Sequence, residues 1–198
     1  MERGNERGHG SGLSFEAGAW IALAVVSLAL RLTALDAAPL SGDEAGQAML
    51  AWRAGSGQGM PSGGIYSPLL LWGNGALFWL FGARDATARL LPALFGVALT
   101  LSPLLLRKPL GRVGSLAAGC CLAISPTALF ASRLLDGATA AAAGLLLVLG
   151  GGVRFGETDD RRWLFAGAAG AALALTADPW AGGMLVALGL AWAGLAWV

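Results

Sequence analysis

The sequence predicts an all-α protein, a polytopic membrane helix bundle with about six transmembrane helices and juxtamembrane helices in its first external loop. Of its 198 residues, 56% are hydrophobic and 13% are charged, whereas a soluble domain carries roughly 25% charged residues. The charges lie in short clusters between apolar runs near the ~20 residues that a spanning helix needs. The many glycines and alanines suit close packing between membrane helices.

The order of apolar runs predicts the elements. A polar tail, 1–14, precedes the first run, 17–35, which is too long for a signal-peptide core and is expected to stay as a helix. The membrane module is expected to cover 15–198, with a long loop at 36–88. Five later runs without a charged residue predict the remaining spans: 90–106, 113–132, 137–153, 163–177 and 179–198.

The apolar stretch 66–83 is ambiguous, and the charges of the loops decide how we interpret it. If 66–83 spanned, the cluster at Arg107 would face the opposite side from the N-terminal tail. If it lies in the membrane interface, all the basic clusters face the cytoplasm, as the positive-inside rule favours. We therefore expect a plasma-membrane protein with a cytoplasmic N-terminus. Its external loop should carry juxtamembrane helices at about 43–54 and 66–82.

Several function classes are excluded by composition. The net charge of +1 gives no electrostatic basis for binding nucleic acid. The single histidine, His9, lies in the polar tail, so a histidine metal site or a Ser-His-Asp triad is not expected. Cys120 and Cys121 are neighbours in an apolar run and are interpreted as small packing residues.

The acidic pair Asp43-Glu44 is the first candidate site. It opens an amphipathic segment whose apolar side is Ala45, Ala48, Met49 and Trp52. A carboxylate at the membrane surface can act as a general base. The alternative is that both acids only stabilise the start of a helix, with Ser41 as its N-cap.

The candidates for substrate binding are Asp136, Arg89 and Arg133. Asp136 lies at the external join between two spans, where acids are often functional; a salt bridge to Arg133 is the alternative. Arg89 precedes a span and could hold a phosphate or act as an interfacial anchor. Asp178, before Pro179, is adequately explained as a turn residue.

Taken in order, these segments resemble the N-terminal half of a GT-C glycosyltransferase. The likeness is to bacterial relatives of dolichyl-phosphate-mannose protein mannosyltransferases and of the aminoarabinose transferase that modifies lipid A. It covers about 17–185. The residues that carry it are Gly42-Asp43-Glu44-Ala45, Ser67-Pro68 to Leu80-Phe81-Gly82, Ala88-Arg89-Leu90-Leu91-Pro92, Ser125-Pro126 and Ser132-Arg133-Leu134-Leu135-Asp136.

The resemblance implies sugar transfer from a polyprenyl-phosphate donor to a protein or glycan acceptor at the external face. Asp43 would be the base with Glu44 beside it, and Asp136 would lie near the donor phosphate or a divalent metal. Two departures stand out. Family members often have His or Glu where this chain has Tyr66 and Ser67. The family also has about twice as many spans, so we expect its C-terminal half to be missing.

Two other classes remain as alternatives. A non-catalytic membrane subunit, or a truncated inactive relative, would keep the fold without the chemistry. A transporter or flippase component should carry polar residues in mid-span. Here the acids lie at the ends of spans, which argues against transport.

Overall fold

The all-α prediction is confirmed in a computed structural model that describes residues 15–58 and 67–196. Every regular element in these ranges is a helix. The polar tail, Tyr66 and the last two residues lie outside the described ranges. The elements are α1 (Phe15–Leu32), α2 (Gly42–Gly55), α3 (Pro68–Phe81), α4 (Asp85–Leu101), the 3-10 helix η1 (Ser102–Leu106), α5 (Arg107–Ile124), α6 (Pro126–Ala131), α7 (Ala138–Thr158), α8 (Arg162–Ala177) and α9 (Ala181–Ala196).

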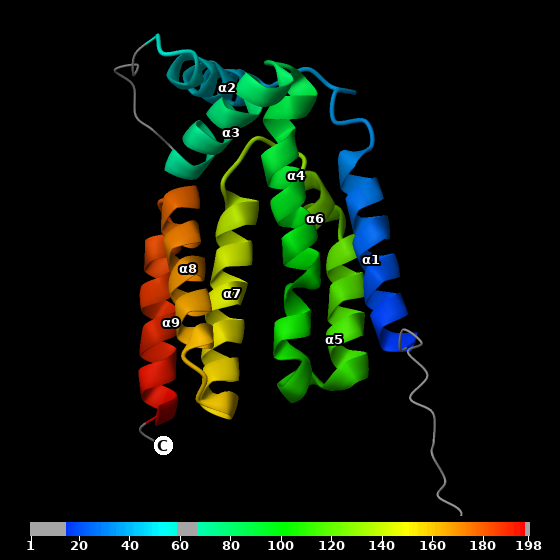
Figure 1. Cartoon of the computed structure of the whole chain (residues 1–198), viewed down its shortest axis with the longest axis vertical. Coiled ribbons are helices and arrows are strands. Elements are labelled where there is room, and N and C mark those ends of the chain that lie inside the picture. The colour runs from blue at the N-terminus through cyan, green and yellow to red at the C-terminus, as the bar shows by residue number, and fades with distance from the viewer. Residues whose placement is uncertain (1–14, 59–66, 197–198) are drawn as a thin grey trace, which may run out of the picture.

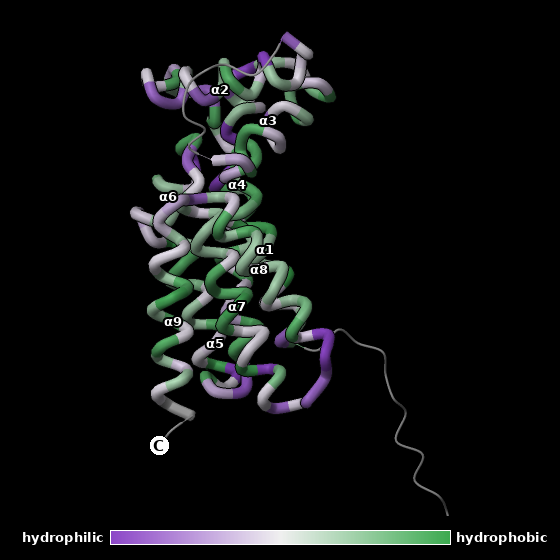
Figure 2. Tube along the Cα trace, turned by 90° about the vertical axis from the view of Figure 1, so that its left-hand side faces the viewer, coloured by the Kyte–Doolittle hydropathy of each residue, from purple (hydrophilic) through white to green (hydrophobic). Residues whose placement is uncertain are grey.

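The helices form two groups. Helices α1, α4, α5, α7, α8 and α9 run alongside one another, whereas α2 and α3 lie across one end of this bundle (Figure 1). Hydrophobic residues dominate the long helices, and hydrophilic residues gather toward the two ends (Figure 2). The predicted juxtamembrane helices correspond to α2 and α3. Each has 14 residues and so measures about 21 Å, less than the ~30 Å of a bilayer core.

Three helical stretches are long and apolar enough to cross a membrane: Phe15–Leu32, Asp85–Ile124 and Ala138–Thr158. The second combines α4, η1 and α5, and the chain reverses direction within it (Figure 1). Gly111 lies near this reversal with φ of +72°, a conformation that glycine adopts without strain. Helices α8 and α9 are apolar but shorter. The expected number of six spans therefore stays a prediction.

Two expected spans are interrupted by proline. The prediction of one helix over 113–132 is wrong, because α5 ends at Ile124 and the short α6 begins at Pro126. Pro126 has no N–H and disfavours helical geometry at the residue before it, and Ser125 has ψ of 120°. Ser102-Pro103 similarly tightens the end of the 90–106 run into η1.

The basic loops meet at the end of the bundle opposite α2 and α3. Glu16 Oε2 at the start of α1 lies 2.6 Å from Arg107 Nη2, and Lys108 Nζ lies 3.2 Å from Glu157 Oε2. Arg154 Nε donates to the carbonyl of Leu105 at 3.0 Å. These contacts place the described basic clusters on the side where α1 begins, as the charge argument expected.

Small residues set the closest helix contacts. A Cβ added at Gly144 would lie 2.6 Å from the carbonyl oxygen of Gly170, and one at Gly55 would lie 2.8 Å from that of Gly75. The first pair joins α7 to α8 and the second joins α2 to α3. Because α3 also contacts α4 and α8, this packing holds the α2–α3 layer on the end of the bundle.

A buried arginine ties three of the long helices together. Arg31 is fully buried, and its guanidinium donates to Ser27 Oγ at 2.6 Å and to the carbonyl of Leu122 at 3.2 Å. Ser27 Oγ in turn donates to Thr100 Oγ1 of α4 at 3.2 Å. Arg31 lies in the last turn of α1 and Leu122 in the last turn of α5, so the negative ends of two helix dipoles lie near the buried charge.

Candidate functional site

The site is built around the first turn of α2. Ser41 is the N-cap: its Oγ accepts from Glu44 N at 3.4 Å, and its own N–H donates to Glu44 Oε2 at 2.9 Å. This reciprocal pair is a capping box, which satisfies backbone donors that the start of a helix leaves free. The alternative interpretation, in which the acids stabilise the start of a helix, is therefore correct for Glu44.

Glu44 also joins α2 to two distant parts of the chain. Its carboxylate is buried and receives Arg89 Nε at 3.1 Å and Arg89 Nη2 at 2.9 Å. The backbone N–H of Leu135 donates to the same carboxylate at 2.9 Å. With the bond from Ser41, four donors fill the four acceptor positions of the carboxylate.

Arg89 is equally saturated. Besides Glu44, it donates to the carbonyls of Leu35, Ala38 and Pro39 at 2.9, 2.7 and 3.2 Å. A guanidinium has five N–H donors, and all five have protein acceptors in these bonds. Arg89 has therefore no donor left for a substrate phosphate, and its contacts are those of a buried structural ion pair, which neither the phosphate-binding nor the interfacial-anchor prediction described.

The electrostatics of this junction favour an ionised Glu44. Burial alone would raise the pKa of its carboxyl. The hydrogen bonds from Arg89 and from the backbone of Ser41 and Leu135 outweigh burial and lower the pKa to about 2. A carboxylate with this pKa and no free lone pair is a poor proton acceptor.

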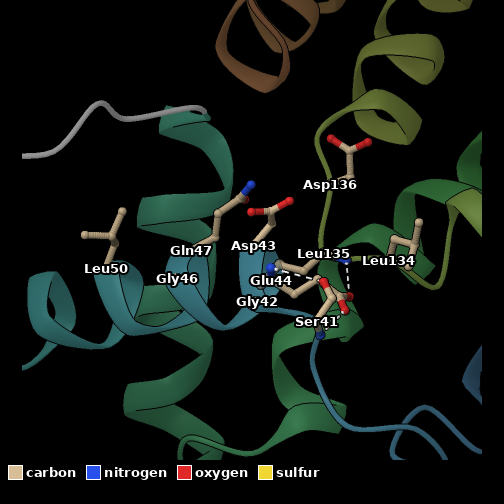
Figure 3. A pocket seen from close by; sticks show the side chains of 10 residues that line it. All are labelled: Ser41, Gly42, Asp43, Glu44, Gly46, Gln47, Leu50, Leu134, Leu135 and Asp136. Carbon is tan, nitrogen blue, oxygen red and sulfur yellow. Dashed lines mark hydrogen bonds between the residues drawn. The ribbon is translucent and has the colours of Figure 1, made fainter.

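Asp43 has the opposite environment. It is exposed at the mouth of a pocket of about 620 Å³ that Asp136 and Gln47 also line. Figure 3 shows the three side chains extending toward the same space, while Glu44 is turned toward Ser41 and the backbone of Leu135. No hydrogen bond or ion pair to another described residue is found for the carboxylate of Asp43 or Asp136. Two residues far apart in the sequence thus present free acids to one cavity.

Arg133 does not pair with Asp136. Its Nη2 donates instead to the carbonyls of Thr33 and Ala34, just after α1. The salt bridge proposed from the i−3 spacing is absent from the described residues, because that spacing brings side chains together only in a helix and α6 ends at Ala131. Arg133 therefore holds the segment before Asp136 against the end of α1.

Two other residues have local structural roles. Ser67, where the resembling family often has His or Glu, is the buried N-cap of α3: its Oγ accepts from Leu70 N at 3.2 Å. Asp178 Oδ1 accepts from Trp180 N at 2.8 Å, as a turn acid does.

Sequence reasoning did not single out Gln47 or the N–H of Leu135. Gln47 lies four residues after Asp43 and so falls on the same side of α2, a spacing that the sequence does contain. The role of Leu135 N–H depends on a contact across 91 residues, for which the sequence carries no signal.

The described residues contain no group of three or more His, Cys, Asp and Glu side chains placed to hold a metal ion. The pocket instead offers two carboxylates, from Asp43 and Asp136, and the amide of Gln47. Magnesium is commonly held by one or two carboxylates together with substrate phosphate and water. These residues fit that kind of shared site, and the metal role of Asp136 stays a prediction.

Comparison of the chain with family models, curated proteins and solved structures gives no match. The likeness to GT-C glycosyltransferases therefore depends on the ordered motifs of the sequence alone.

Proposed function

We propose that this chain is a membrane glycosyltransferase, or the N-terminal module of one, acting on a polyprenyl-phosphate-linked sugar at the external face. The observation that carries the proposal is the pocket that Asp43 and Asp136 share at the end of the bundle. Both carboxylates are free, and both lie opposite the basic loops that the positive-inside rule assigns to the cytoplasm. A lipid-linked donor would reach this pocket from the outer leaflet.

In the proposed reaction Asp43 is the general base. An acceptor hydroxyl bound beside Asp43 gives its proton to the carboxylate, while its oxygen attacks the anomeric carbon of the sugar. The bond between that carbon and the phosphate oxygen breaks, and the polyprenyl phosphate leaves with the bonding electron pair. Positioned acid–base catalysis of this kind contributes about 10²–10⁴-fold to rate.

Asp136 and Gln47 would orient the substrates. The Gln47 amide can donate to a sugar hydroxyl, and Asp136 can accept from one or share a divalent ion with the donor phosphate. Glu44 and Arg89, which the sequence offered as candidates for catalysis and substrate binding, are assigned here to holding α2 in place. Arg133 would likewise hold in place the segment that carries Asp136.

Asp43→Asn tests the proposal directly. Purified full chain in nanodiscs would be given polyprenyl-phosphate mannose or polyprenyl-phosphate aminoarabinose with membrane acceptors, and release of polyprenyl phosphate would be measured. We expect Asp43→Asn to lower the rate by about 10²–10⁴-fold without changing the thermal unfolding temperature. Asp36→Asn is the matched control, because Asp36 is an exposed acid outside this pocket. Equal rates in both variants would remove Asp43 from the mechanism.

A non-catalytic membrane subunit is the second candidate. It is favoured by the lack of a free arginine or lysine among the residues that line the pocket, since a phosphate donor normally meets cationic groups. A folded wild-type chain that releases no polyprenyl phosphate from either donor, with or without magnesium, would establish this alternative.

A further inference from the structure

A second cavity lies on the other side of α2. It is a groove of about 330 Å³, lined by Ala45, Ala48, Met49 and Trp52 of α2, with Phe78 of α3 and the start of α4 closing it. The four α2 residues are the apolar stripe of the amphipathic helix, on which the proposed sugar transfer makes no demand. Helix α2 thus separates an acidic pocket from an apolar groove.

The described chain leaves this groove open. Met49 is 49% exposed and Trp52 is 39% exposed although both face an apolar hollow. The neighbouring end of α3 adds Trp79, Leu80 and Phe81, all more than half exposed. Exposed apolar surface on this scale is typical of contact with lipid or a partner, and tryptophan favours the membrane interface.

An arginine side chain lies at the edge of the groove. Arg84 lines it and is exposed, and no described residue forms a hydrogen bond or ion pair with its guanidinium. Its neighbour Asp85 also lines the groove but lies in the first turn of α4, where the helix dipole stabilises a carboxylate. Of the other arginines nearby, Arg89 has all its donors bound to the protein, Arg133 is bound to carbonyls just after α1, and Arg53 is exposed but does not line the groove.

The position of Arg84 fixes the depth of the groove. Arg84 immediately precedes α4, whose apolar run is expected to span the bilayer from residue 90, so Arg84 lies a few residues outside that span and near headgroup level. An apolar groove at that depth, with a free guanidinium at its edge, suits an acyl chain that is joined to a phosphate group. Guanidinium groups pair well with phosphoryl oxygens.

We propose that this groove binds a phospholipid of the surrounding bilayer, with one acyl chain over Met49 and Trp52 and the phosphate at Arg84. The site is separate from the acidic pocket, and it stands whether or not the chain transfers sugar. Bound lipid would cover the apolar side of α2.

Photolabelling can test the site. The purified full chain in a nonionic maltoside would be titrated with phosphatidylglycerol carrying a diazirine on one acyl chain, and labelled residues would be mapped by mass spectrometry. A diazirine diacylglycerol with the same chains is the matched lipid without the phosphate. We expect saturable labelling of α2 and of 83–88 by the phospholipid, with affinity for the diacylglycerol about tenfold weaker.

Three variants separate the parts of the proposal. Arg84→Gln should weaken phospholipid binding to the level of the diacylglycerol. Arg53→Gln removes another exposed arginine of the same layer, one that does not line the groove, and should leave the labelling unchanged. Met49→Gln, at an exposed position, should weaken binding of both lipids.

Three results would overturn the proposal. Labelling of α2 that rises in proportion to lipid without saturating would indicate ordinary contact with the micelle. Equal effects of Arg84→Gln and Arg53→Gln would remove the phosphate contact. Displacement of the phospholipid by an equimolar polyprenyl phosphate would assign the groove to the sugar donor.

Discussion

Glu44→Gln offers the sharpest test of how the α2–α3 layer is held on the bundle. The variant keeps the size of the side chain but removes its charge. It also replaces one acceptor oxygen with an amide group, which can only donate. Arg89 would then be a buried cation without a counter-charge. In either orientation of the amide, one N–H of Arg89 and one backbone N–H, that of Ser41 or of Leu135, would face another donor.

The expected cost follows from the burial of the pair. Both side chains are 7% exposed, and breaking a buried ion pair by removing one partner costs about 3–5 kcal/mol. For a chain of 150–250 residues, each kcal/mol shifts the unfolding midpoint by about 2–4 °C. Glu44→Gln should therefore lower the midpoint by roughly 6–20 °C, measured by tryptophan fluorescence in detergent.

Asp43→Asn is the matched control, because it makes the same chemical change one residue earlier at an exposed side chain. It should shift stability by less than about 0.5 kcal/mol. Equal midpoints for the two variants would refute the argument that Glu44 is the structural acid. The double variant Glu44→Gln/Arg89→Gln should cost less than the sum of the single variants. It should still be less stable than wild type, because the carbonyls of Leu35, Ala38 and Pro39 lose the Arg89 guanidinium and one backbone N–H loses its acceptor oxygen.

The remaining predictions concern pH and packing. Because the pKa of Glu44 is lowered to about 2 from 4.5, its ionisation contributes about 3 kcal/mol of stability above pH 4.5. That contribution is lost as pH falls toward 2, and pH-dependent unfolding should show a flatter profile in Glu44→Gln. Arg133→Gln should speed hydrogen exchange in 132–137, measured by mass spectrometry, because it frees two carbonyls after α1; unchanged exchange would contradict this. Gly96→Ala should destabilise by about 1–3 kcal/mol, since its Cβ would lie 2.5 Å from Ser132 Cβ. Gly46→Ala, with nothing within 4 Å, should be neutral or stabilising by up to about 1 kcal/mol in the same thermal assay.

Local chemistry made part of the structure predictable from the sequence. Apolar runs and charge clusters predicted an all-helical chain whose described basic loops gather at one end. Ser41 was predictable as an N-cap because serine is strongly preferred just before the first turn of a helix, where its hydroxyl accepts from a free backbone N–H. The order of spans and loops along the sequence was enough to predict that Asp43 and Asp136 lie at the same end of the bundle. That prediction needs no knowledge of side-chain contacts.

The failures come from contacts that sequence spacing does not encode. The partners of Glu44 lie 45 and 91 residues away, so nothing local distinguished it from Asp43. The suggested Arg133–Asp136 pair assumed a helix, whereas α6 ends at Ala131 and both residues lie beyond it. In both cases the backbone path decided which side chains meet.

Asp43 and Glu44 are adjacent in the sequence, but their side chains lie in different environments in the structure. Successive residues of an α-helix point about 100° apart, so only one of the two acids can face the core. Glu44 does so, and its bonds to Arg89 and Leu135 N–H fix the rotation of α2. With that rotation set, Asp43 and Gln47 line the acidic pocket, and the apolar stripe lines the groove. A change at Glu44 would therefore disturb both cavities at once. Loss of sugar transfer in a Glu44 variant would not make Glu44 catalytic, whereas the same loss in a stably folded Asp43→Asn would identify the base.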